Sequence, residues 1–259
     1  MSEQPAMHPQ IKPYRADLHI HTALSPCASE EMTPPAIVAA ALRAGLDMIA
    51  VSDHNSAGNV AAVQEAARAA GGALAVIAGM EITSMEEAHV LALFPDAAAA
   101  EGVSSHLRGM LPELGEHYRS YFGDQPLMDQ AGSVTGKETV ALAFATPLDL
   151  NDTVEIIHGA GGLAIAAHVD RKTFSVFSQL GFFPTDAGFD GVEVSRHVKP
   201  DSPRLQEFAA LGLPLTGSSD SHYLEDIGTA STELRLAAPT FPELVLAFAE
   251  AEGRSVAHA

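Results

Sequence analysis

The chain lacks tryptophan, has a single cysteine (Cys27) and contains no apolar run long enough to cross a membrane. One cysteine excludes an internal disulfide and fits a reducing compartment. The longest apolar run, residues 73–80, has only the length of a strand. Residues 1–15 contain no apolar segment of the kind found in secretory signals. We therefore expect a cytoplasmic protein with no membrane partner.

Basic residues are also scarce, with 14 Lys and Arg against 33 Asp and Glu, which gives a formal net charge of −19. Binding to nucleic acid depends largely on Lys and Arg that neutralise phosphates. The charge therefore predicts a small-molecule substrate and no nucleic-acid partner.

Apolar runs and helical patterns alternate along most of the sequence. Strands are expected at 14–18, 46–51, 73–79, 88–94, 163–167, 191–194 and 213–217, and helices at 33–44, 57–70, 152–159, 173–180, 203–211 and 240–251. The helix at 152–159 is expected to be capped by Asn151. About seven apolar strands alternating with helices predict an α/β fold, a (β/α) barrel that is distorted from the eight-stranded form.

Residues 97–150 interrupt this rhythm with helical and loop-like patterns and carry no chemical motif. We interpret them as a mainly helical insertion in a single domain, residues 1–259. Such an insertion serves as a lid, an oligomer contact or a specificity element.

Candidate functional residues stand where the predicted strands end. They are His19, His21, Asp53, His54, Glu81, His168, Asp220 and His222. In a parallel α/β barrel the strand ends form the active site. His89 differs because it begins its strand, and it reaches the same rim only if that strand forms a hairpin with the strand before it.

Histidine and carboxylate together predict a metal site. In His19-Ile20-His21 both imidazoles lie on one face of a strand, since side chains repeat with period two. A single histidine at a strand end is more often a structural residue, but so many convergent donors favour metal binding. Mixed nitrogen and oxygen donors suit Zn²⁺, Fe²⁺ or Mn²⁺. The donors are too many for one four-coordinate ion, so we expect two or three divalent ions.

These motifs together resemble the PHP (polymerase and histidinol phosphatase) family. The matching segments, in order, are 17–22 (DLHIHT), 51–55 (VSDHN), 79–83 (GMEIT), 88–91 (AHVL), 167–168 (AH) and 219–222 (SDSH). The resemblance implies a distorted (β/α)₇ barrel of TIM-like type with up to three metals. It assigns His19, His21, Glu81 and Asp220 to the first ion, Glu81, His89 and His168 to the second, and His54 and His222 to the third.

Cys27 departs from the pattern, because some members of the family have a further histidine there. Its thiolate is one more candidate ligand, and the alternative is a small buried residue. Asp53 is either a ligand or a group that orients His54 or a catalytic water.

Two arginines and a histidine near the predicted rim complete the candidate site. Arg171 and Arg196 are candidates to bind a substrate phosphate, because guanidinium matches phosphate with two parallel hydrogen bonds. Surface salt bridges are the alternative for both. His197 is either a general acid for the leaving group or an exposed loop residue.

The resemblance and the donors lead to a hydrolase that cleaves a small phosphorylated substrate with metal-bound hydroxide at a di- or trinuclear site, a phosphomonoester being favoured. One alternative is an amidohydrolase-like enzyme that cleaves a C–N or C–O bond. Such enzymes with two metals usually have a bridging modified lysine, and none of Lys12, Lys137, Lys172 and Lys199 stands at a predicted strand end. The other alternative is a PHP module that binds metal without catalysis.

Overall fold

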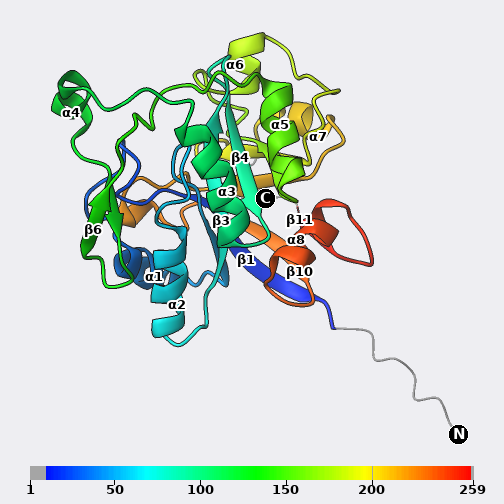
Figure 1. Ribbon diagram of the computed structural model, residues 1–259. Coiled ribbons are helices and arrows are strands. Elements are labelled where there is room, and N and C mark those ends of the chain that lie inside the picture. Colours follow the sequence, from blue (N-terminus) through cyan, green and yellow to red (C-terminus); the bar gives the residue numbers. More distant parts are fainter. Residues whose placement is uncertain (1–9, 200, 258–259) are drawn as a thin grey trace, which may run out of the picture.

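The computed structural model describes residues 10–199 and 201–257 (Figure 1). Its main sheet has nine strands in the order β11-β10-β1-β2-β3-β4-β7-β8-β9. Their bounds are β1 Lys12–Ile20, β2 Met48–Val51, β3 Ala75–Thr83, β4 His89–Phe94, β7 Leu163–Ala166, β8 Gly191–Ser195, β9 Leu215–Ser218, β10 Thr232–Leu236 and β11 Ser255–Ala257.

Seven of these strands, β1 to β4 and β7 to β9, curl into a nearly closed barrel. The two edges meet through the segment after β9, where His21 N donates to Ser221 O at 3.0 Å and Ser221 N donates to His19 O at 3.2 Å. The predicted distorted (β/α)₇ barrel is confirmed. β10 and β11 extend the sheet beyond β1 by antiparallel pairing.

The distortion comes from β4, which runs antiparallel to both of its neighbours, β3 and β7. The pairs β1–β2, β2–β3, β7–β8 and β8–β9 are parallel. β3 and β4 form a hairpin in which Thr83 pairs with His89. The start of β4 therefore lies at the barrel end where β3 finishes, which is the condition under which His89 reaches the rim.

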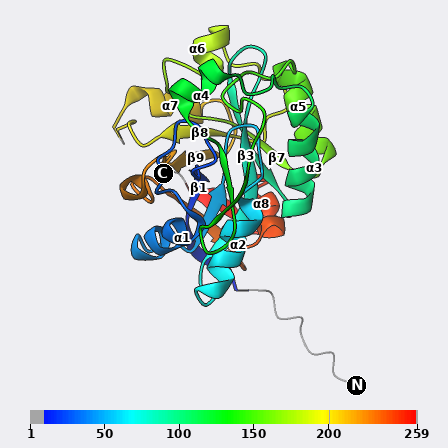
Figure 2. The same cartoon turned by 60° about the vertical axis from the view of Figure 1, so that its left-hand side comes forward.

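Helices surround the barrel in both views, with α1, α2, α3 and α5 around the outside (Figure 2). The helices around the barrel and at its ends are α1 Pro34–Arg43, α2 Val60–Ala69, α3 Ala97–Arg108, α5 Leu150–Gly159, α6 Val176–Leu180, α7 Pro203–Ala209 and α8 Phe241–Phe248, and a 3₁₀ turn lies at Leu224–Asp226. The cap of α5 is Asp149, whose side chain accepts from Asp152 N, and not the predicted Asn151. No described helix is long and apolar enough to cross a membrane.

Alternation along the strands separates two apolar layers and places the polar residues. In β3, Met80 and Ile82 pack outward in the layer beneath the helices, whereas Ile77 packs in the second layer, inside the barrel. Side chains an even number of residues apart in a strand point to the same side of the sheet. Glu81 therefore points inward like Ile77, and His89 points inward like Leu91. Residues of α8 pack in the same inner layer, so apolar side chains fill one end of the barrel and leave the other to polar groups.

The 97–150 stretch has two structural parts. α3 contacts β3 and β4 as a barrel helix does. The remainder carries α4 (Glu116–Phe122) and a two-stranded sheet of β5 (Pro126–Met128) and β6 (Val134–Lys137), which the sequence patterns do not predict. Asn55, just after β2, donates from Nδ2 to Leu142 O and Phe144 O, which fastens this part beside the strand ends. Its role as a lid or specificity element stays a prediction.

Candidate metal centre

The eight predicted ligands gather at the polar end of the barrel. They are His19, His21, His54, Glu81, His89, His168, Asp220 and His222. All are buried except His222, which is partly exposed. No single strand supplies more than two of them, so the cluster exists only when the barrel closes.

Glu81 stands at the middle of this cluster. Its Oε1 lies 2.7 Å from His89 Nδ1 and 3.0 Å from His168 Nε2. Its Oε2 lies 3.1 Å from His54 Nδ1 and 3.4 Å from His21 Nε2. One carboxylate thus contacts donors from both sides of the cluster, as a bridging ligand must.

Three overlapping groups of donors have the spacing to hold a cation, with ligand atoms all within 4.8 Å of one another. They are His19, His21, Glu81 and Asp220; His54, Glu81 and His89; and His21, His54 and His222. Two buried ring nitrogens in these groups, His19 Nε2 and His54 Nδ1, have no hydrogen-bond partner in the described part of the chain. Buried polar atoms are rarely left unpaired. Divalent cations fit here because they would satisfy both.

The charges of the cluster are strongly coupled. Burial alone would raise the pKa of Glu81, but the neighbouring His89 and His19 hold it well below its usual range. Burial alone would lower the pKa of His19, yet the carboxylates of Glu193, Glu81 and Asp220 raise it well above its usual value. Burial and the charge of His222 lower the pKa of His21 to about 4. The cluster therefore keeps its carboxylate charge, while the shifts favour the protonated ring at His19 and the neutral ring at His21.

Partners behind the cluster orient its imidazoles. His19 Nδ1 lies 2.9 Å from Glu193 Oε1, and His21 Nδ1 lies 2.9 Å from Ser25 Oγ. Such partners fix which ring nitrogen carries the proton and leave Nε2 free to bind a cation. Our sequence analysis did not single out Glu193. Its signal was a carboxylate in the middle of the apolar run 191–194, where a charge is not expected without a partner.

Asp53 lies behind the cluster. Its carboxylate accepts from Thr22 N and from the hydroxyl groups of Thr22 and Ser25, all at 2.7 Å. Burial raises its pKa in spite of these bonds. Ser25 contacts His21 in turn, so Asp53 holds the loop that orients this imidazole.

Cys27 faces the cluster from that same loop. Its Sγ lies 3.2 Å from His54 Nε2 and 3.0 Å from His222 Nε2. The residue is exposed and belongs to no apolar core. The interpretation as a small buried residue is wrong.

The two predicted phosphate-binding arginines differ in their contacts. Arg171 reaches the cluster, with a guanidinium nitrogen 2.7 Å from Asp220 Oδ2. Arg196 instead pairs with Asp226 at 2.9 Å. His197 is exposed and lines a rim cavity of about 530 Å³ with Lys199 and Arg204. No contact among the described residues joins Arg196 or His197 to the cluster, and their roles stay predictions.

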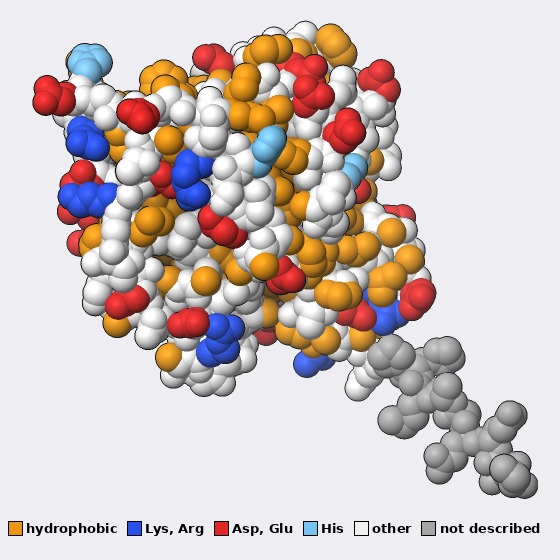
Figure 3. All heavy atoms as spheres, viewed as in Figure 1, with side chains coloured by type: hydrophobic (Ala, Val, Ile, Leu, Met, Phe, Trp, Pro, Cys, Tyr) orange, Lys and Arg blue, Asp and Glu red, His pale blue; other side chains and the backbone are white. Residues whose placement is uncertain are grey.

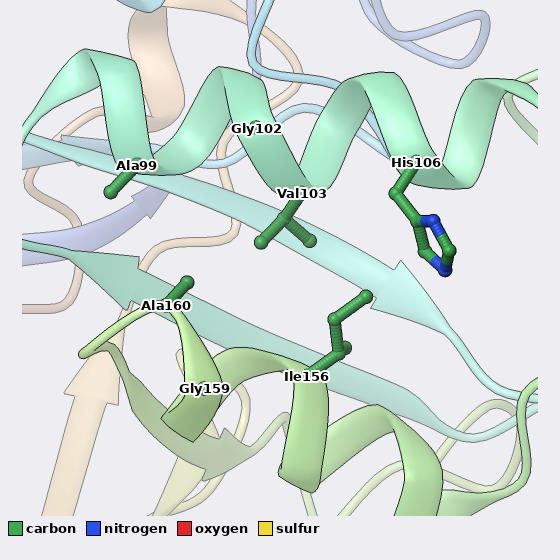
Figure 4. A pocket seen from close by; sticks show the side chains of 7 residues that line it. All are labelled: Ala99, Gly102, Val103, His106, Ile156, Gly159 and Ala160. Carbon is green, nitrogen blue, oxygen red and sulfur yellow. The ribbon is translucent and has the colours of Figure 1, made fainter.

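Another cavity, of about 440 Å³, lies on the outside of the barrel between α3 and α5 (Figure 4). Ala99, Val103 and Ile156 give it an apolar lining, and His106 lies at one end. It contains none of the predicted site residues, so it has no part in the metal centre.

Comparison with known proteins identifies both fold and family. The family model of the PHP domain matches residues 17–158, more than half of the chain, and a second model, PHP-associated, matches residues 205–252. No curated protein matches the sequence.

Solved structures of similar fold are only distantly related in sequence. The lesion-specific endonuclease Q of Pyrococcus furiosus has a TM-score of 0.65 at 17% identity, over 95% of this chain and 58% of that one. This chain thus spans little more than half the length of that enzyme. An amidohydrolase from Chromobacterium violaceum, solved with sulfate, has a TM-score of 0.61 at 21% identity, over 90% and 96% of the two chains. A protein from Bifidobacterium adolescentis assigned as a metal-dependent phosphoesterase has a TM-score of 0.57 at 22% identity, over 80% and 87%.

One expectation is overturned. An endonuclease Q structure with a TM-score of 0.65 holds a 27-mer duplex with an abasic lesion at the active site, so excluding a nucleic-acid partner on net charge was wrong. The net charge sums the whole surface, whereas binding depends on the local field at the site. On the face in Figure 3 the acidic side chains are spread out rather than gathered in one patch, and Lys and Arg lie mainly at its left and lower parts.

The two matched segments contain seven of the eight donors, and His168 lies between the segments. The fold of the solved relatives is that of the barrel described above. The chain belongs to the PHP domain family of metal-dependent hydrolases.

Proposed function

We propose that this protein hydrolyses a phosphate ester at a centre of two or more divalent transition-metal ions. The observation that carries the proposal is Glu81, whose two oxygens lie within 3.4 Å of ring nitrogens of five histidines at or near the ends of four strands. Beside it Arg171 lies against Asp220 and reaches the open rim. The side chains that could bind metal ions and the guanidinium that could bind phosphate thus lie next to one another.

The first cation position is assigned to His19, His21, Glu81 and Asp220, and the second to Glu81, His54, His89 and His168. Cations there supply a water of lowered pKa and stabilise negative charge on phosphoryl oxygens. Zn²⁺, Fe²⁺ and Mn²⁺ suit these donors. Glu193 and Ser25 would keep the imidazoles of His19 and His21 in the orientation for cation binding, and Asp53 would hold Ser25 in place.

Arg171 is assigned to the substrate phosphate. Its side chain is about one-third exposed, at 37%, and so can leave Asp220 partly and turn toward a ligand. Its guanidinium offers two parallel donors to phosphate oxygens. Because the cations and Arg171 together carry more positive charge than Glu81 and Asp220 neutralise, a dianionic phosphomonoester fits better than a monoanionic diester.

An amidohydrolase-type reaction is the second candidate, favoured by the similar fold of the Chromobacterium violaceum protein. Against it, no lysine among the described residues contacts the cluster, and Glu81 stands where a bridging group is needed. The phosphoesterase is therefore preferred.

The test is elemental analysis of the protein purified without chelator, with hydrolysis assayed on the same sample. We expect at least two transition-metal ions per chain. p-Nitrophenyl phosphate should be cleaved, and activity should be lost on chelation and restored by metal. Bis(p-nitrophenyl) phosphate and an abasic-site DNA duplex, assayed in parallel, distinguish a monoesterase from a diesterase.

Arg171→Met gives a second arm. Loss of this donor should reduce kcat/KM for the phosphate ester roughly 100-fold and leave the metal content unchanged. Arg68→Met, on the exposed face of α2, is the matched control. A metal-loaded protein that cleaves an amide or lactone but no phosphate ester would refute the proposal.

A further inference from the structure

One large aromatic side chain at the edge of the centre stays exposed although it stands against a candidate metal ligand. The ring of Phe174 stacks on the imidazole of His89, with the two centroids 4.9 Å apart and the planes inclined by 17°. Phe174 is nevertheless 42% exposed, whereas His89 is buried. One face of the phenyl ring therefore covers the imidazole, and the other face is open to solvent. Among the described residues no second aromatic ring stacks on it.

Packing does not account for the position of this ring. The φ of Phe174 is 59°, in the left-handed region that a residue with a bulky side chain rarely adopts. Phe174 is not among the side chains that form the apolar layers of the barrel, so no burial in the core offsets this strain. Strained residues of this kind persist where other contacts hold them, and they gather at sites that bind ligands.

The contacts that hold Phe174 come from the centre itself. Phe174 O accepts from His89 N at 2.8 Å, at the start of β4. The segment between β7 and α6 also carries His168 and Arg171, and Arg171 N donates to His168 O at 2.9 Å. Ser175, the N-cap of α6, donates from Oγ to Arg171 O at 2.8 Å. One short segment thus fixes a candidate metal ligand, the arginine assigned to phosphate and the exposed phenyl ring.

The stack also sets how a ligand could reach the open face. His89 Nδ1 lies 2.7 Å from Glu81 Oε1, so the imidazole of His89 stands between Phe174 and the second proposed cation position. A ring on the open face of Phe174 is then two ring spacings away from His89. A molecule that occupies this face and the cations at the same time needs a spacer of several bonds between its ring and its phosphate.

We propose that Phe174 determines substrate specificity by stacking on a planar ring of the leaving group, which a flexible spacer joins to the phosphate ester. The inference rests on the proposed phosphoesterase and describes the alcohol that this reaction releases. Aromatic side chains bind planar rings by offset stacking, which gives an advantage over apolar contact alone. The same contact tolerates rings of different chemistry, because every such ring has a π-face.

Two esters of equal length isolate this contact. Phenylpropyl phosphate and cyclohexylpropyl phosphate have the same spacer and nearly the same apolar volume, but only the phenyl ring is planar. The values of kcat and KM are measured for both on the metal-loaded, full-length protein. We expect kcat/KM to favour the phenyl ester by roughly 2- to 10-fold, mainly through KM. p-Nitrophenyl phosphate has its ring directly on the ester oxygen, so its hydrolysis should not depend on Phe174.

Variants at this position separate stacking from a general effect on the centre. Phe174→Leu keeps an apolar side chain but removes the planar face, so the preference for the phenyl ester should vanish, and Phe174→Tyr should retain it. Phe182→Leu is the matched control, because Phe182 is 61% exposed beyond the other end of α6, and it should behave as the wild type does. If Phe174→Leu slowed all three esters equally and left the preference unchanged, the inference would be overturned.

Failure of this inference is distinguishable from failure of the proposed reaction. Equal kcat/KM for the two propyl esters in the wild type, with p-nitrophenyl phosphate still cleaved, would overturn the stacking role and leave the hydrolase standing. If no ester is cleaved, calorimetry measures the binding of the same two esters to the metal-loaded protein. Tighter binding of the phenyl ester that Phe174→Leu abolishes would then keep the stacking role and refute the reaction, whereas equal affinities would refute both.

Discussion

Glu81 Oε1 lies 2.7 Å from His89 Nδ1, and Glu81 contacts histidines through both of its oxygens. Glu81→Gln keeps the shape but places an amide NH₂, a donor, where a cation needs an acceptor. We expect loss of at least one bound ion per chain and a fall in activity by a factor on the order of 100 or more. Elemental analysis and steady-state kinetics measure both.

The matched control is Glu65→Gln on the exposed face of α2, where the carboxylate has only a weak ion pair with Arg68 at 3.5 Å. A Glu81→Gln protein with full metal content and normal activity would contradict the bridging role.

Glu193 is a positioning residue, because its carboxylate contacts the imidazole of the predicted ligand His19. Glu193→Gln weakens the acceptor for His19 Nδ1 and removes one of the charges that raise the pKa of His19. We expect metal affinity to fall roughly 10- to 100-fold, with kcat recovering at saturating metal. A competition assay with a metal-binding dye measures the affinity, and kcat that stays low at saturating metal would assign Glu193 a direct part in catalysis.

For single residues, the sequence indicated the candidate metal ligands better than the residues that orient them. The eight ligand candidates were predictable because each follows or begins an apolar run, and a closed barrel brings such positions together. Glu193 was not singled out because nothing in its local pattern names His19 as its partner, 174 residues away. Asp53 and Arg196 were among the candidate residues, but their partners lie in loops, and the apolar pattern of a sequence does not predict the path of a loop.

The β3–β4 hairpin brings Glu81 and His89 together, and Gly79 in β3 is closely enclosed by the neighbouring strands. A Cβ at Gly79 would lie 2.9 Å from both Ala92 O and Val51 O, which are backbone atoms of the flanking strands. We expect Gly79→Ala to lower the free energy of unfolding by about 1–3 kcal/mol, because the strands must move apart. Chemical denaturation measures it.

Gly102→Ala on α3 is the matched control. No atom lies within 4 Å of a Cβ built there, and the residue is inside a helix. Alanine should raise stability by up to about 1 kcal/mol. Equal effects of the two substitutions would contradict the packing argument.

Among the elements, the long apolar strands and the helices with clear ends were predictable. The direction of β4 was not, because an apolar strand reads the same in either direction. β10 and β11 were not predicted because they have only five and three residues, and because the pairing of β10 with β1 joins opposite ends of the chain. β11 pairs with β10. The hairpin of β5 and β6 consists of strands of three and four residues, too short for any period to show.

Over the whole molecule, proton uptake and metal binding oppose each other. In the metal-free protein the carboxylates of Glu193, Glu81 and Asp220 raise the pKa of His19 in spite of burial, so this ring keeps its proton to higher pH than a free imidazole. Because its folded pKa is raised, this proton stabilises the metal-free fold below the unfolded value of 6.5, and that contribution is lost as pH rises through the folded pKa. A cation needs the unprotonated ring, so binding expels the proton and stabilisation by metal grows with pH.

We therefore expect the increase in Tm on metal loading to be larger at pH 8 than at pH 6, with proton release detectable by calorimetry in buffers of different ionisation enthalpy. Differential scanning calorimetry of chelated and loaded samples measures the shift. A shift that does not depend on pH would contradict the protonation state assigned to His19.

The closure of the barrel between β1 and the segment after β9 has a consequence for how the protein is made. His21 and Asp220, whose side chains meet at 3.1 Å, are 199 residues apart in sequence. A nascent chain that has emerged from the ribosome only through β4 carries His19, His21, His54, Glu81 and His89, but neither His168 nor Asp220. The complete set of eight donors therefore comes together only after the segment that follows β9 has been made, and a chain interrupted after β4 carries five of them.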